Sequence, residues 1–299
     1  MDGILGNGPK GPIGITTENI ESIKIEWASN TLPSEKNPDG KNEDAVLADS
    51  RRRLFAIFDG MGGHAAGDVA SRLAKKAIAE YFLDNNLDIS SIEDLQSVLS
   101  EALTGANSAI IKYAREHPEH NDTGTTVSAV KIFSDKNGKS FAVVGNVGDS
   151  RVYKLSKDGE LTQITIDDDE LSVSPYSREE RITIAKKLAG ARRKEELNTT
   201  EQIYFNNRRH ITQALGRKDV AVALYRVGIQ LGDRLLITSD GVHDNLTTNE
   251  IKEIVGAKIK LENIAKQLTE QARTRSRKPK TEEMRAKPDD MSVIVVEIK

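Results

Sequence analysis

The sequence has 299 residues, of which 37% are hydrophobic and 30% charged, and its net charge is −3. This composition is typical of a globular protein with a substantial core, and so small a net charge gives no global attraction to nucleic acid or to an anionic membrane. The chain has no cysteine, which excludes disulfides, zinc–thiolate sites and cysteine nucleophiles. No apolar run reaches the ~18 residues that a membrane helix needs, so we expect a soluble, cytoplasmic protein without a membrane partner.

Residues 1–20 are rich in glycine and are predicted to be a flexible lead-in to one domain over residues 21–299. Alternating or continuously apolar stretches predict the strands, which are residues 22–29, 44–49, 53–58, 124–133, 140–146, 150–155, 161–165, 220–227, 234–238 and 291–298. Apolar side chains at helical spacing predict helices over residues 68–82, 91–115, 248–254 and 261–274. In the first of these helices we place Val69, Leu73, Ala77 and Ile78 on the buried face.

Residues 166–210 differ in character from the rest of the chain. They are acidic at 167–170, helical and basic around 181–194, and then polar. Because few apolar residues are available there, we interpret the stretch as a flap inserted on the sheet and not as a separate core.

The order of the predicted elements bears on the fold class. Strands come first, two helices follow, then a run of strands, two helices and a last strand. Runs of like elements favour layering of the α+β type over an alternating parallel sheet. We therefore expect an α+β fold, a four-layer αββα sandwich of two antiparallel β-sheets flanked by helices.

The stretch from Leu54 to Gly67 carries the strongest local signal. An apolar run of strand length ends in Asp59, and Gly60, Gly62 and Gly63 follow at once. An ionised carboxylate at the end of a buried strand is costly unless it meets a cation or hydrogen-bond donors. We interpret Asp59 as a metal ligand and the carbonyl of Gly60 as a second ligand; the alternative is a strand–turn–helix connection in which Asp59 is only a cap.

Four other acidic clusters lie beside predicted strands, and they are 42–44, 145–151, 238–244 and 288–292. Carboxylates gathered at strand ends repel one another, and hard divalent cations such as Mg²⁺ or Mn²⁺ relieve that repulsion. Since the chain lacks cysteine and has only 5 histidines, zinc is the poorer candidate.

Taken together, these motifs resemble those of the metal-dependent serine/threonine protein phosphatases, the PPM or type 2C family, in its bacterial-type branch. The matching residues are Asp59-Gly60, Gly124-Thr125-Thr126, the 145–151 stretch, Ser239-Asp240-Gly241 with Asp244, and Asp289-Asp290. The resemblance extends from about residue 22 to the end of the chain. It implies hydrolysis of phosphoserine and phosphothreonine in protein substrates, by direct attack of a water or hydroxide that bridges two metal ions.

The resemblance also implies a role for each ligand. Asp59 would bridge both ions, Asp240 and Asp289 would bind the first, and Glu43 with the Gly60 carbonyl would bind the second. Asp149, together with Asp240 and Asp244, matches the position of a third ion.

Two departures from the family pattern bear on catalysis. The usual phosphate-binding arginine is replaced by Asp39, and Lys36 or Lys41 is the candidate substitute. Asp290 stands where the family commonly has asparagine, which adds negative charge beside Asp289. His64 is a candidate general acid, and the alternative is a histidine at a helix start that does no chemistry.

Three hypotheses of function follow. The first is an active phosphatase, which we expect to be a monomer. The second is a pseudophosphatase or regulatory binding module that keeps the fold, with the missing arginine as its main support. The third is nucleic-acid binding through the basic run from Arg273 to Lys280, which we disfavour because such a run is usually a solvated loop.

Overall fold

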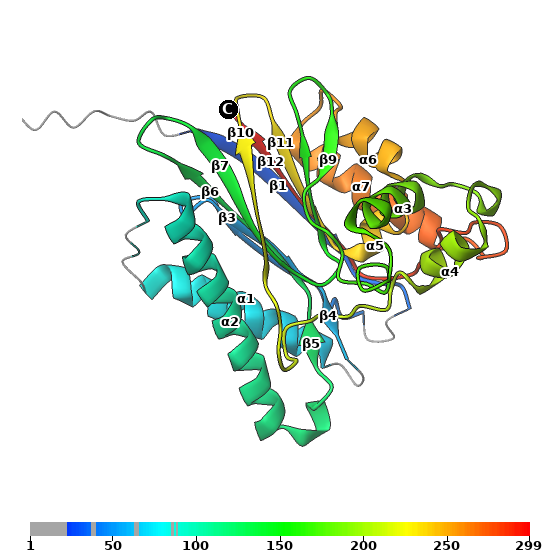
Figure 1. The fold of residues 1–299 in the computed structure, drawn as a ribbon, viewed down its shortest axis with the longest axis horizontal. Helices are drawn as coiled ribbons and strands as arrows, with labels where there is room; N and C mark the ends of the chain where they lie inside the picture. The colour runs from blue at the N-terminus through cyan, green and yellow to red at the C-terminus, as the bar shows by residue number, and fades with distance from the viewer. Residues whose placement is uncertain (1–22, 37–39, 63–65, 85–86, 88) are drawn as a thin grey trace, which may run out of the picture.

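The computed structural model describes residues 23–36, 40–62, 66–84, 87 and 89–299. Its strands form two antiparallel five-stranded sheets and one small pair (Figure 1). The β12 sheet has the order β1 (Ile25–Leu32), β12 (Met291–Ile298), β11 (Arg234–Thr238), β8 (Arg151–Leu155) and β9 (Leu161–Gln163). The β7 sheet has the order β10 (Ala223–Ile229), β7 (Ser140–Val147), β6 (Val127–Ser134), β3 (Leu54–Phe58) and β2 (Ala45–Asp49). The pair is formed by β4 (Gly60–Met61) and β5 (Gly124–Thr125).

Helices cover the outer faces of both sheets, which confirms the four layers (Figure 1). Helices α1 (Gly67–Asp84) and α2 (Ile92–Glu116) pack on the β7 sheet, and α6 (Thr248–Val255) and α7 (Leu261–Ser276) pack on the β12 sheet. A third apolar cluster lies between the sheets and includes Phe55, Val130 and Ile294. The short helix α5 (Asp240–His243) follows β11, and two single 3₁₀ turns lie at Pro118–His120 and Lys194–Glu196.

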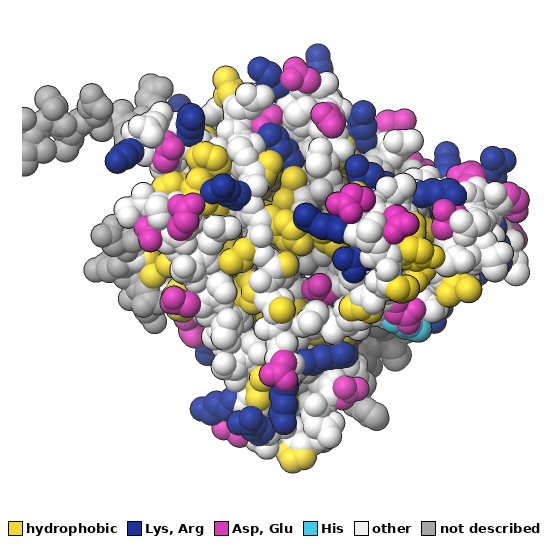
Figure 2. Space-filling model, viewed as in Figure 1, with side chains coloured by type: hydrophobic (Ala, Val, Ile, Leu, Met, Phe, Trp, Pro, Cys, Tyr) yellow, Lys and Arg dark blue, Asp and Glu magenta, His cyan; other side chains and the backbone are white. Residues whose placement is uncertain are grey.

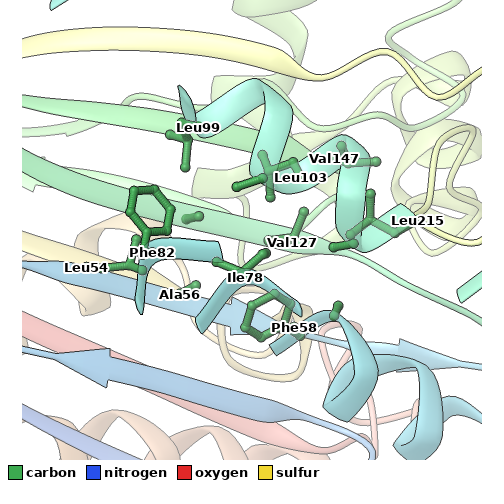
Figure 3. Packing of buried hydrophobic residues seen from close by; sticks show 14 of the residues in the cluster. Leu54, Ala56, Phe58, Ile78, Phe82, Leu99, Leu103, Val127, Val147 and Leu215 are labelled. Atoms are coloured by element: carbon green, nitrogen blue, oxygen red, sulfur yellow. The ribbon is translucent and has the colours of Figure 1, made fainter. Parts of the chain in front are cut away.

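The packing of α1 and α2 explains why these segments are helical. Ser91 caps α2 by accepting a hydrogen bond from the backbone N–H of Asp94, and the apolar stripe of α2, including Leu99 and Leu103, is buried. Figure 3 shows these two leucines, Ile78 of α1, and Phe58 of β3 gathered in one cluster. Every residue of β3 is buried, as its continuous apolar character predicts.

The predicted buried face of α1 is correct at Ile78 and displaced at the other positions. The fully buried positions are Ala70, Ala74 and Ile78, whereas Val69 and Leu73 are only half-buried. The two alanines let the first turns of the helix approach the sheet and α2 closely, and the larger Ile78 is buried further along.

Strand boundaries also differ from the prediction at the sheet edges. The strand predicted at 22–29 is β1, which runs from Ile25 to Leu32 because it pairs along the whole of β12. The strand predicted at 220–227 begins at Ala223 and ends at Ile229, where β10 pairs with Ser140 of β7. The Asn-Gly pair at 137–138 is typical of a hairpin turn, and such a turn precedes β7, with Gly138 at φ +77°.

The segment over residues 166–210 contains α3 (Arg178–Gly190) and α4 (Thr199–Asn207). Contrary to our interpretation, it has enough apolar residues for a small buried cluster of its own, which includes Leu171, Leu188 and Phe205. The low overall hydrophobicity hid this cluster, because its few apolar residues come together from distant turns. We call residues 166–210 the flap segment.

A buried arginine outside the flap segment ties it to the main body. The guanidinium of Arg285 donates to the carbonyls of Leu188 and Ala191 at 3.0 Å each, and to those of His243 and Leu246 at 3.0 and 3.2 Å. One side chain thus satisfies carbonyls at the ends of two helical regions, which a neutral side chain could not do. On the outside, charged side chains of both signs are interspersed (Figure 2), in keeping with the small net charge.

Candidate metal centre

The predicted ligands lie at the ends of strands from both large sheets. Asp59 follows β3, and Asp149 lies in the turn between β7 and β8. From the other sheet, Asp240 begins α5 directly after β11, and Asp289 comes just before β12. The four carboxylates influence one another, since Asp240, Asp289 and Asp149 all act to raise the pKa of Asp59. The sandwich therefore brings together acids that are as much as 230 positions apart in the sequence, the separation between residues 59 and 289.

The backbone of Asp59 is held by two threonines of the neighbouring strand. The N–H of Asp59 donates to the Thr126 hydroxyl at 3.2 Å, and its carbonyl accepts from the N–H of Thr126 and the hydroxyl of Thr125 at 2.9 Å each. Among the residues that the structure describes, no N–H group donates to the carboxylate of Asp59. This favours the metal-ligand interpretation over the cap, because a capping carboxylate accepts from backbone N–H groups.

Glycines bring the loop of Glu43 against Asp59. A Cβ on Gly60 would lie 2.2 Å from the carbonyl oxygen of Gly67 and 2.6 Å from that of Glu43, so only glycine fits there. A Cβ on Gly67 would in turn lie 3.0 Å from the carboxyl carbon of Glu43. The backbone of Gly60 is thus in direct contact with those of Gly67 and Glu43, and the Glu43 carboxyl group lies against Gly67.

Two further acids support this arrangement, and the sequence analysis had given neither of them that role. Asp290 is buried and accepts hydrogen bonds from the backbone N–H groups of Ser34 at 2.5 Å and Glu43 at 2.7 Å. Asp44 Oδ2 accepts from the Ser239 hydroxyl at 2.7 Å. Asp290 therefore anchors the loop of Glu43. It also brings the additional negative charge that we expected from the sequence. The Glu-Asp and Asp-Asp pairs were visible in the sequence, but only the fold shows which member turns toward a backbone.

At one end of the cluster the carboxylates have mainly other carboxylates as charged neighbours. Burial raises the pKa of Asp59 well above its usual range, and the charge of Asp44 raises it further. Burial raises the pKa of Asp44 as well, and that of Glu43 to a smaller extent. Asp44 Oδ1 is buried and has no hydrogen-bond partner in the described part of the chain. An unpartnered buried oxygen among like charges is a suitable donor for a divalent cation.

At the other end a lysine lies among the acids. The Nζ of Lys287 contacts a carboxylate oxygen of Asp240, and it lies 3.2 Å from Asp289 Oδ2 and 3.3 Å from Asp244 Oδ2. Burial acts to lower the pKa of Lys287, but Asp240 and its neighbours outweigh burial and raise that pKa well above its usual value. Burial raises the pKa of Asp240 to about 6, although Lys287 opposes the shift. The sequence analysis missed Lys287, because a lysine before Pro-Asp-Asp is not distinctive by itself.

A second cation reaches the cluster from the flap segment. Arg208, the residue after α4, places its Nε 2.9 Å from Asp244 Oδ1, and its guanidinium lies 4.0 Å from the centre of the Phe205 ring. Burial acts to raise the pKa of Asp244, but Arg208 and then Lys287 hold it well below its usual value. Asp244 is therefore paired through both of its carboxylate oxygens.

Asp149 is intermediate between these two environments. It is buried, burial raises its pKa well above the usual range, and Asp240 adds to the shift while Lys287 opposes it.

Three residues bear on the predicted phosphate binding and proton donation. Of these, His64 and Asp39 lie outside the described residues, and Lys41 is exposed. As the side chains stand, no group of three or more His, Asp or Glu residues within the described ranges has the geometry to hold a metal ion. The all-oxygen donor set and the unpartnered oxygen of Asp44 nonetheless fit a hard divalent cation at the Asp59 end.

Comparisons with known proteins agree with this geometry. The chain is 35% identical over 257 residues to the serine/threonine protein phosphatase PstP of Mycobacterium tuberculosis (strain CDC 1551 / Oshkosh), a match that covers 86% of this chain and 42% of the relative. It therefore spans less than half the length of that relative. It is also 28% identical over 209 residues to the serine/threonine phosphatase stp of Listeria innocua, covering 70% of this chain and 73% of the relative.

The fold is similar to that of a solved relative. A crystal structure of the catalytic domain of PstP in complex with two manganese ions matches with a TM-score of 0.69 and 29% identity, covering 93% of this chain and 99% of that one. The family model for protein phosphatase 2C matches residues 37–284. Since that match includes most of the sequence, this chain belongs to the protein phosphatase 2C family.

Proposed function

We propose that this chain is a metal-dependent phosphatase that hydrolyses phosphoserine and phosphothreonine in proteins. The observation that carries the proposal is the gathering of Asp59, Asp240 and Asp289 from both sheets, with the pKa of Asp59 raised by burial and by the other carboxylates. Divalent cations relieve this repulsion between carboxylates, and they also activate water and neutralise charge on the phosphoryl group in phosphoryl transfer.

Two ions, Mn²⁺ or Mg²⁺, would be held by Glu43, Asp59, Asp240, Asp289 and the carbonyl of Gly60. When bound, they would activate water for attack on phosphorus and neutralise charge on the phosphoryl oxygens. The hydroxyls of Thr125 and Thr126 hold the backbone of Asp59 in place, and the Asp290 carboxylate holds Glu43 by accepting from its backbone N–H. This support limits the movement of the ligands and so favours a fixed site for the phosphoryl group.

The residues at the third-ion position do not fit a further divalent cation. Both carboxylate oxygens of Asp244 are already paired, one with Arg208 and the other with Lys287. We infer that two ions are used here and that the ammonium group of Lys287 supplies the positive charge at the third position.

Substrate phosphate would be bound by Lys41 or by Lys36, in place of the usual arginine. Either lysine offers a point charge without the two-pronged geometry of a guanidinium, so we expect weaker orientation of the phosphate. His64 remains our candidate for protonating the leaving oxygen of the serine or threonine.

The other parts of the proposal concern the setting of the enzyme. We propose a monomer in the cytoplasm that acts on phosphoproteins and not on nucleic acid; the mixed surface charge and the net charge of −3 support this. In the described part of the chain, the helices are all too short or too polar to pass through a membrane.

The test is hydrolysis of a phosphothreonine peptide, measured as released phosphate, with Mn²⁺, with Mg²⁺ and with EDTA. We expect turnover that requires a divalent cation. If the folded protein binds Mn²⁺ and yet releases no phosphate from phosphopeptides or p-nitrophenyl phosphate, the non-catalytic binding module is the better interpretation.

A further inference from the structure

A pocket of about 450 Å³ opens beside the metal centre, between the loop at 33–36, the end of α7 and the chain that leads into β12. Asp289, one of the proposed metal ligands, forms part of its wall. A group bound in this pocket would therefore lie next to a phosphoryl group held at the metal centre. The position is suitable for a residue that neighbours the phosphorylated serine or threonine in a substrate.

The lining of this pocket is strongly basic. The basic residues that line it are Lys36, Arg273, Arg277, Lys278 and Lys280, and the acidic ones are Glu35 and Asp289. Arg277 is neutralised by Glu35, with Nε and Oε2 2.8 Å apart. No carboxylate of the described residues lies within ion-pair distance of the four remaining basic side chains. We call these four residues, Lys36, Arg273, Lys278 and Lys280, the basic pocket.

The helix dipole explains only part of this charge. Arg273 lies in the last turn of α7, where a cation stabilises the helix. Lys278 and Lys280 lie beyond the helix, and Lys36 comes from a different part of the chain. The cations also act on one another: burial lowers the pKa of Lys280, and Arg208, Arg209 and Lys287 lower it further. Because only Glu35 and Asp289 oppose five basic side chains in this lining, the pocket favours an anionic ligand.

We propose that the basic pocket binds an acidic side chain, aspartate, glutamate or a second phosphorylated residue, next to the phosphorylated residue of the substrate. The inference rests on the proposed phosphatase function and assigns its substrates to an acidic class. A peptide fits these observations better than nucleic acid does, because no aromatic side chain for base stacking is present among the described residues that line the pocket.

The test compares two phosphothreonine peptides that differ only in acidic or neutral residues beside the phosphothreonine. Wild type should have a KM about tenfold lower for the acidic peptide, as expected for a few partly exposed charge pairs. The double variant Lys278→Ala/Lys280→Ala should lose most of this preference with kcat unchanged, because binding common to ground and transition states is removed. Its KM for p-nitrophenyl phosphate should stay at the wild-type value.

The matched control is Lys252→Ala/Lys258→Ala, which removes two exposed lysines outside the pocket. It should keep the preference for the acidic peptide. Equal KM values for the two peptides in wild type, or an equal loss of preference in the control, would overturn the inference. So would a single-stranded oligonucleotide that competes with the acidic peptide for wild type and not for the Lys278/Lys280 variant.

Binding of the same peptides, followed by fluorescence anisotropy in Mn²⁺, separates this inference from the proposed function. Binding of the acidic peptide that depends on Lys278 and Lys280, without any hydrolysis, supports the pocket and contradicts only the phosphatase. Hydrolysis without discrimination contradicts only the pocket.

Discussion

The two ends of the acidic cluster differ in the charges that surround their buried carboxylates. At the first end, Glu43, Asp44 and Asp59 have raised pKa values, and the charged neighbours that act most strongly on Asp59 are carboxylates. At the second end, Asp244 has a lowered pKa because Arg208 and Lys287 are its neighbours. We call them the carboxylate-only end and the ion-paired end.

The difference shows which part of the centre depends on an added cation. Buried carboxylates without positive charge are costly, whereas paired ones are tolerated. The carboxylate-only end should therefore require metal ions, whereas the paired Asp244 at the other end should need none. Each of the following experiments tests this distinction, from the largest expected effect to the smallest.

Removal of metal ions should produce the largest change. At a hundredfold excess over the dissociation constant, each bound ion stabilises the folded state by about 2.7 kcal/mol, so two ions contribute about 5 kcal/mol. We expect EDTA to lower the melting temperature measured by calorimetry and to abolish phosphatase activity, and Mn²⁺ to restore both. Identical melting curves with EDTA and with Mn²⁺ would contradict the comparison.

Asp59→Asn tests the carboxylate-only end directly. The substitution keeps the shape of the side chain and removes the charge that would offset both ions, so activity should fall at least ~100-fold. The metal-free protein should remain folded, because carboxylate repulsion is relieved. Titration calorimetry should show fewer Mn²⁺ bound than in wild type, and a variant with wild-type stoichiometry and rate would show that Asp59 is not a ligand.

Lys287→Met tests the ion-paired end. The substitution removes the ammonium group, keeps a side chain of similar length, and leaves Asp240, Asp244 and Asp289 without their common cation. This loss should lower the free energy of unfolding in EDTA by about 2 kcal/mol. In calorimetry the variant should bind three Mn²⁺ where wild type binds two. Lys287→Arg keeps the charge and serves as the control. Three ions in wild type would show that Lys287 does not replace an ion.

Asp169→Asn tests the cost of a buried carboxylate outside the metal ligand set. Burial raises the pKa of Asp169 to about 6, with a further contribution from Asp167. The folded state therefore favours the protonated acid, and stability that is present below about pH 4 is lost as the pH rises through 6.

The asparagine of this variant has no charge and can still accept the hydrogen bond from Ser172 N–H at 2.9 Å. The variant should be more stable than wild type by about 1 kcal/mol at pH 8 and equal to it at pH 5, measured by urea unfolding. The exposed Asp158→Asn is the control, and a gain of the same size at both pH values would refute the explanation.

Much of the fold could be predicted because its signals are local. The continuous apolar run of β3, the stripe of α2 and the turn at Gly138 each indicate one structure over a few residues. The face of α1 was misplaced because alanines carry little periodic signal, and the extent of β1 depends on its partner β12. These two strands lie near opposite ends of the chain, so their pairing depends on the whole fold and cannot be predicted from either segment alone.

The site was predictable to the extent that its chemistry repeats along the chain. Acids beside predicted strands pointed to Asp59, Asp240 and Asp289, and the family resemblance then implied their roles. Lys287 and Arg208 could not be predicted, because their importance comes from contacts with Asp244 that connect distant segments. The basic run from Arg273 to Lys280 was visible, but its place beside Asp289 was not.

The connection between the flap segment and the centre limits how this chain can be recombined with its relatives. Arg208 belongs to the flap segment, yet its guanidinium neutralises a buried acid of the main body, and Arg285 of the main body in turn holds carbonyls of the flap segment. A chimaera that exchanges residues 166–210 without an arginine at position 208 would leave Asp244 with only Lys287 as a partner. Residues 166–210 are therefore not an interchangeable module, because the stretch that differs most in character from the rest of the sequence shares its charge pairing with the main body.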